Sequence, residues 1–82
     1  MNFKAATDAL FGGISHERLA KTLGVSIATI RQARLRPDAR AHRSPPEDWE
    51  HGVAQLAEEQ IAAYRHLIDA IHRRHDHENR AV

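Results

Sequence analysis

The chain of 82 residues contains no cysteine, which excludes disulfides, thiolate metal sites and cysteine nucleophiles. It also has no run approaching the roughly 20 apolar residues that a membrane-spanning helix needs, and no apolar signal segment follows Lys4. We therefore expect one small domain in the cytoplasm. A core of this size is only marginally stable by itself, so a partner or a second copy often contributes to folding.

Net charge is also nearly absent, at +1, but the two halves of the chain differ. Residues 1–45 carry eight Lys or Arg and three acidic residues, whereas residues 46–82 carry four Arg and eight acidic residues. The first half is therefore at +5 and the second at −4. This asymmetry gives the first half the polarity of a nucleic-acid-binding surface, although scatter in so short a chain explains the charges alone equally well.

Strand-forming sequence is scarce, because only residues 25–27 look β-like and they are too few for a sheet. Serines placed to cap helices and glycines placed to end them divide the first half into short amphipathic segments. We predict an all-α protein with helices over about residues 2–11, 15–24, 26–35 and 45–75. The residues expected to face the core in the first three helices are Phe3, Ala6, Leu10, Leu19, Ala20, Leu23, Ile30, Ala33 and Leu35.

The last helix is predicted from the segment Ser44-Pro45-Pro46-Glu47, which combines a capping box with proline at the first helical position. Gly52 could split off a short first segment, because glycine costs about 1 kcal/mol against alanine in a helix. Trp49 is expected to anchor this helix to the others rather than to stack on bases. We divide the chain into a DNA-binding unit with a basic loop (1–43), a long helix (44–77) and a disordered tail (78–82).

The stretch RLAKTLGVSIATIRQARL predicts two short helices joined by a glycine turn. Ala20 is the small residue needed where the helices cross, and Gly24 tolerates the left-handed turn. The second helix would then expose an arginine-bearing face, and a helix of this kind fits the DNA major groove. An ordinary helical hairpin without a DNA role is the alternative.

Residues His16–Leu35 resemble the lambda-repressor/Cro-like (XRE-type) helix-turn-helix family, whose spacing of alanine, glycine and a branched aliphatic residue is met by Ala20, Gly24 and Ile30. The resemblance implies sequence-specific binding of double-stranded DNA. It implies base contacts by Ile27, Ala28, Arg31 and Gln32. It implies phosphate contacts by His16 and Thr29. Further candidates for phosphate contacts, with a solvated loop as the alternative, are Arg34, Arg36, Arg40 and Arg43.

The sequence departs from that family after the motif, because a proline-rich loop and one long helix stand where two short helices are usual. The motif followed by PPEDW and a long helix is similar to small phage- and plasmid-borne regulators, including anti-CRISPR-associated repressors. The long helix carries a seam with 4-3-4-3 spacing, which is suited to pairing with another helix. Its residues are Ala57, Ile61, Tyr64, Ile68 and Ile71.

We therefore predict a homodimeric transcriptional repressor that binds a pseudo-palindromic operator at the nucleoid. The alternative is a protein-interaction or antitoxin-like adaptor whose long helix binds a different protein. Non-specific compaction of nucleic acid is disfavoured by the acidic second half. No enzyme activity and no cofactor are expected, since no nucleophile lies beside a base and no Gly-rich phosphate loop is present.

A metal site is the weaker interpretation of one cluster of His and Asp residues near the C-terminus. These residues are His72, His75, Asp76 and His77. Their helical spacing could bring two or three ligands to one face. Because a fraying helix end holds coordination geometry poorly, we expect solvated side chains there and no metal.

Overall fold

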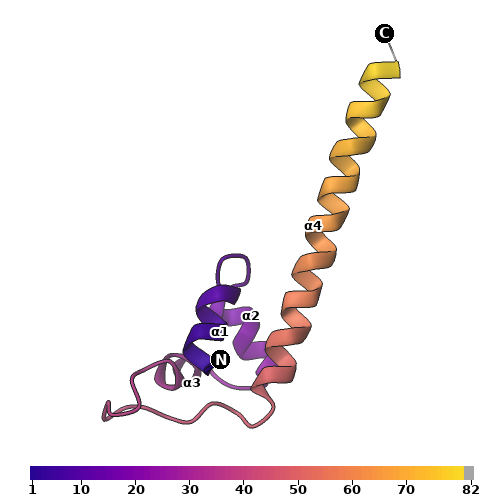
Figure 1. Ribbon diagram of the computed structural model, residues 1–82. Coiled ribbons are helices and arrows are strands. Elements are labelled where there is room, and N and C mark those ends of the chain that lie inside the picture. Colours follow the sequence, from indigo (N-terminus) through magenta and orange to yellow (C-terminus); the bar gives the residue numbers. More distant parts are fainter. Residues whose placement is uncertain (81–82) are drawn as a thin grey trace.

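The computed structural model describes the backbone of residues 1–80 and the side chains of residues 1–76. Three short helices, α1 (Phe3–Leu10), α2 (His16–Leu23) and α3 (Ile27–Ala33), precede one long helix, α4 (Trp49–Arg80). Within residues 1–80 there is no strand, so the predicted all-α class is confirmed. Figure 1 shows α1–α3 clustered beside the first part of α4, whose remaining length extends away from them.

Each short helix begins at a side chain that caps its first turn. The side-chain oxygens of Asn2, Ser15 and Ser26 accept hydrogen bonds from backbone N–H groups three residues ahead, at 2.8, 3.1 and 3.1 Å. These bonds satisfy donors that have no partner inside the helix. The two serine caps expected from the sequence are confirmed.

Gly24 ends α2 in the left-handed conformation, with φ of 70°, and its backbone N–H donates to carbonyls of the last turn. This geometry turns the chain sharply into α3. The end of α3 was predicted too late, because the helix stops at Ala33. Leu35 therefore lies outside the helix and 42% exposed, instead of facing the core as expected. Pro37 disfavours helical geometry at Arg36, so the helix could not continue past Leu35 in any case.

One core joins the three short helices to α4. Its buried apolar members are Phe3, Ala6, Leu10, Ile14, Leu19, Ala20, Ile30, Ala33 and Leu56. Thr7 is the buried polar residue, and its hydroxyl donates to the Phe3 carbonyl at 2.8 Å. Trp49 meets the Phe3 ring edge to face, with ring centres 5.3 Å apart. The tryptophan therefore packs between α4 and α1, as the sequence predicted.

The start of α4 was predicted four residues too early. The helix begins at Trp49, whose N–H donates to the Pro46 carbonyl at 3.1 Å in a turn before the first helical residue. Pro46 disfavours helical geometry at Pro45, so the helix cannot begin there, and residues 46–49 form a turn instead. The helix then continues to Arg80, so residues 78–80 are helical rather than a disordered tail; residues 81–82 lie outside the described part.

Gly52 does not interrupt α4, contrary to one expectation from the sequence. The glycine is buried where α4 crosses α2, and a Cβ atom there would come within 2.5 Å of Leu23 Cδ2. The missing side chain thus allows the two helices to approach closely, and the surrounding packing stabilises the helix through this position.

The molecule is elongated, with extents of 65 × 20 × 19 Å and a radius of gyration of 17.8 Å. A compact chain of this length would have a radius of gyration of about 12 Å. The difference arises because α1 and α2 pack against the first part of α4 and leave its second half without a neighbour in the described chain. The seam predicted on α4 therefore lies largely in the open.

Candidate nucleic-acid interface

Helix α3 is fixed to the core along one side and open along the other. Ile30 and Ala33 are buried, with 0% and 5% of their surfaces exposed. The four residues predicted to contact bases lie on the remaining surface of the helix and its cap: Ala28 and Arg31 are exposed, and Ile27 and Gln32 are half-buried. The long helix contacts α1 and α2, so the arginine-bearing side of α3 stays accessible.

Two of these residues also have contacts within the chain. Ile27 packs against the edge of the core, so only part of its side chain is available to a ligand. The carbonyl of Gln32 accepts a hydrogen bond from the Arg43 N–H at 3.2 Å. This bond returns the basic loop to the end of α3 and places Arg43 next to the predicted base-contacting surface.

The two residues predicted to contact phosphates at the helix starts lie at those starts. His16 is the first residue of α2, and its ring stacks on Phe11 with centres 3.8 Å apart and planes at 30°. Thr29 lies in the first turn of α3, and its hydroxyl shares a hydrogen bond with the Ser26 hydroxyl at 2.9 Å. Both side chains are half-buried and therefore held in defined positions.

The four arginines proposed for phosphate contacts fall into two groups. Arg34 forms an ion pair with Asp8 and lies over the Phe11 ring, and its side chain is only 21% exposed. Arg36 is 83% exposed and pairs with the neighbouring Asp38 at 3.1 Å. Arg40 and Arg43 are exposed on the loop that returns to α3. The geometry thus gives Arg34 a role in joining α3 to α1 that the sequence analysis missed.

Asp8 is the acidic residue of this contact between α1 and α3. The pKa of its carboxyl is lowered from the ordinary value of 3.8, first because Lys4 Nζ donates a hydrogen bond to it at 2.8 Å. Burial opposes this effect, and the hydrogen bond from Arg34 and the positive charges of Lys4 and Arg34 lower the pKa further. Asp8 is therefore ionised at neutral pH and offsets the charge of Arg34.

The structure divides the predicted seam on α4 into two parts. Ala57 is half-buried and packs against the core of its own chain. The other four residues lie on an open apolar stripe together with Leu67, which the prediction omitted. The exposed fractions of Ile61, Tyr64, Leu67, Ile68 and Ile71 are 55, 51, 53, 49 and 56%.

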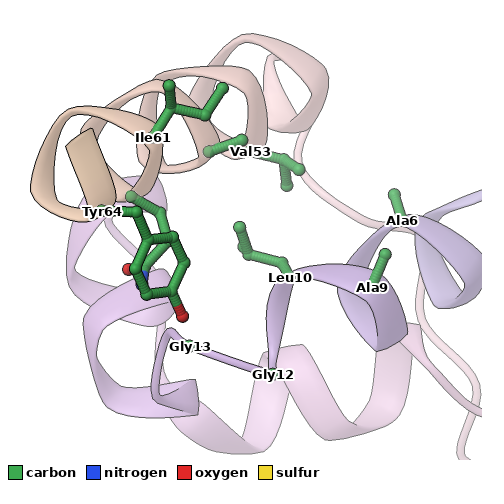
Figure 2. Close-up of a pocket in the computed structure, with 10 residues that line it drawn as sticks. Ala6, Ala9, Leu10, Gly12, Gly13, Val53, Ile61 and Tyr64 are labelled. Atoms are coloured by element: carbon green, nitrogen blue, oxygen red, sulfur yellow. The ribbon is translucent and has the colours of Figure 1, made fainter. Parts of the chain in front are cut away.

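A groove between α1 and α4 continues this stripe toward the core (Figure 2). It has a volume of about 440 Å³, and its walls include Ala9 and Gly13 on one side and Val53 and Ile61 on the other. Tyr64 extends from α4 toward the Gly12–Gly13 turn. Gly13 also permits a close approach of this turn to α4, because a Cβ atom there would come within 2.8 Å of Gln60 Nε2.

Two further expectations concern the surface. Among the side chains that the structure describes, no three His, Asp or Glu groups gather as metal ligands would. The side chain of His77 lies outside that part of the chain. Over the same described residues, no helix combines the length and the hydropathy needed to cross a membrane.

Comparison of the chain with protein-family models, with curated proteins and with solved structures finds no match. The resemblance to the lambda-repressor/Cro-like family therefore rests on residues His16–Leu35. Two surfaces of the chain are open to a ligand or partner, the arginine-bearing side of α3 and the apolar stripe of α4.

Proposed function

We propose that the protein binds double-stranded DNA sequence-specifically and acts as a dimeric transcriptional repressor at the nucleoid. One observation carries the proposal. A short helix, α3, is fixed to the core by Ile30 and follows a left-handed turn at Gly24, while Arg31 is exposed on its open side. A major groove accepts a helix held in this way, and rigid attachment allows its side chains to discriminate bases.

The side chains of α3 match particular base edges. The planar guanidinium of Arg31 suits O6 and N7 of guanine, and the amide of Gln32 suits N6 and N7 of adenine. Ala28 and the exposed part of Ile27 suit the thymine methyl group. Phosphate contacts are assigned to His16, Thr29, Arg36, Arg40 and Arg43, which would orient the helix on the duplex.

Dimerisation completes the proposal, because one short helix reads few base pairs. A twofold dimer reads two half-sites separated by about 34 Å or a multiple of that distance. The half-exposed stripe on α4 supplies an apolar surface for it. A dimer on its operator would block polymerase, and the concentration of the protein would set its occupancy.

The test is selection of binding sites from random duplex DNA by the purified protein. We expect an inverted repeat, and we expect Arg31→Ala to lower affinity for it by about 10- to 100-fold, the discrimination of one bidentate base contact. Arg73→Ala, an exposed arginine on the distal part of α4, is the matched control and should leave affinity unchanged. Failure to enrich any sequence would contradict the proposal.

A second candidate function is an antitoxin-like or adaptor module whose α4 binds a different protein. The uncovered stripe on α4 supports this function as well as it supports homodimerisation. The two candidates differ in the mass of the isolated protein in solution. A homodimer should be saturated at micromolar concentration, whereas a module that awaits another protein should be a monomer or should aggregate.

A further inference from the structure

The apolar stripe on α4 has an internal symmetry. Ile61 and Ile71 each lie five residues from His66, and Tyr64 and Ile68 each lie two residues from it. All four side chains are about half exposed, and the buried residues of α4 among those that the structure describes, Gly52 and Leu56, both precede them. A helix that reverses direction about His66 would therefore present the same apolar pattern to this one.

We propose that a second copy of the chain covers the stripe with its own α4 in antiparallel orientation, centred near His66. The inference rests on the dimer of the proposed function and specifies its geometry. In this register Ile61 packs against the partner's Ile71, and Tyr64 packs against the partner's Ile68. Leu67 lies close to the twofold axis, where it meets the partner's Leu67.

The distribution of charge along α4 favours the antiparallel orientation. Residues 44–64 contain five acidic residues and no Lys or Arg, whereas residues 65–80 contain four arginines and three acidic residues. A parallel pair would place the two acidic segments side by side. In the antiparallel register residues 65–80 lie level with the partner's residues 52–67, where Glu58 and Glu59 lie, so a segment with net positive charge meets one with net negative charge.

The groove between α1 and α4 is a second feature that favours the partner's α4 as the helix that covers the stripe. Ile61 and Tyr64 line both the groove and the stripe, so one helix can lie along the two without a break. In the antiparallel register the partner's residues 71–76 lie level with residues 56–61 and enter the groove. Ala6, Ala9 and Gly12 give the α1 wall of this groove small residues, so the partner's side chains can enter it (Figure 2).

The antiparallel pairing separates the two DNA-binding units. The part of α4 that carries α1 and α2 is centred near residue 54, so the two such parts lie about 36 Å apart along the helix axis at 1.5 Å per residue. The units are thus held toward opposite ends of the dimer. This arrangement suits half-sites that are separated by one or more turns of DNA.

The orientation can be measured directly, because the chain has no cysteine and accepts unique spin labels. Gln55→Cys and His66→Cys place labels at exposed positions on the same side of α4. Distances between labels in the full-length dimer would be measured by pulsed dipolar spectroscopy. The antiparallel dimer predicts a distance at residue 55 more than about 10 Å longer than at residue 66, because the labels at 55 are also offset along the axis.

Equal distances at the two positions would establish a parallel pair and overturn the inference. A monomeric mass at high micromolar concentration would also overturn it. Ile68→Asp should convert the dimer to a monomer, while Ala62→Asp, the same change at an exposed position off the stripe, should leave the dimer intact. Loss of the dimer in both variants would contradict the assigned surface.

These outcomes are independent of the DNA selection. An antiparallel dimer that selects no DNA sequence would contradict the proposed function and support this inference. A parallel dimer that selects an inverted repeat would support the proposed function and contradict this inference.

Discussion

The guanidinium carbon of Arg34 lies 4.8 Å from the centre of the Phe11 ring, where the end of α3 meets the end of α1. The same guanidinium forms an ion pair with Asp8, and its Nε atom is buried without a hydrogen-bond partner among the described residues. The planar group is thus packed between an aromatic face and a carboxylate. This contact fixes α3 at its C-terminal end, while Ser26 caps its start.

The first prediction follows from the shape of that guanidinium. Arg34→Lys keeps the charge but loses the planar stack on Phe11, so we expect a loss of about 1 kcal/mol in unfolding free energy. In a domain of this size the melting temperature should fall by about 4–8 °C. Arg31→Lys, at an exposed position, is the control and should leave the melting temperature unchanged. An unchanged melting temperature for Arg34→Lys, with weaker DNA binding, would instead assign Arg34 to a phosphate contact.

The second prediction concerns how the stability of the fold changes as the pH becomes acidic. Because the pKa of Asp8 is lowered in the folded chain, its carboxylate stabilises the fold above the ordinary pKa of 3.8. That contribution is lost as the pH falls through the lower folded value. Asp8→Asn should therefore lower the melting temperature at pH 7, and the difference from wild type should shrink as the pH falls below 3.8. Asp69→Asn on the exposed part of α4 is the matched control. A difference between wild type and Asp8→Asn that persists at low pH would contradict this mechanism.

The helices and their caps could be predicted because the signals for them are local. Ser15 and Ser26 bond to N–H groups only three residues ahead, and Gly24 ends its helix by its own backbone geometry. The two prolines before α4 give opposing signals. Proline is favoured as the first residue of a helix, but it disfavours helical geometry at the residue before it. The sequence therefore predicted that α4 exists but not where it begins.

Contacts between distant residues could not be predicted in this way. Arg34 meets Asp8 across 26 positions, so the sequence analysis assigned it to the DNA surface with its neighbours. The hydrogen bond from Arg43 to Gln32 likewise depends on how the loop returns to α3. The exposure of Arg31 followed from helical periodicity alone. Its role in reading bases stays a prediction.

The third prediction concerns Gly52, where two effects oppose each other. Alanine would favour the helix by about 1 kcal/mol, but its Cβ would lie 2.5 Å from Leu23 Cδ2. Because overpacking costs about 1–3 kcal/mol, we expect Gly52→Ala to lower the unfolding free energy by about 1 kcal/mol. In a Leu23→Ala background the clash is absent, and the same change should be stabilising. Chemical denaturation of the four proteins in this cycle measures the coupling, and equal effects in both backgrounds would show that α2 and α4 do not constrain Gly52.

The fourth prediction separates the two kinds of contact assigned to the DNA surface. Arg40 is exposed on the loop beside α3, and a phosphate contact there would strengthen binding to every sequence alike. Arg40→Ala should weaken specific and non-specific binding by similar factors. It should also reduce the slope of log affinity against log salt by about 1.

Arg31→Ala should act differently, because it should weaken the selected site far more than other sequences and relax the preference at one position of each half-site. The measurement is a salt titration of binding to the selected site and to a scrambled duplex, with Arg73→Ala as control. Equal loss on both duplexes for Arg31→Ala would remove α3 as the element that reads sequence, because an arginine that only neutralises phosphate cannot distinguish one duplex from another.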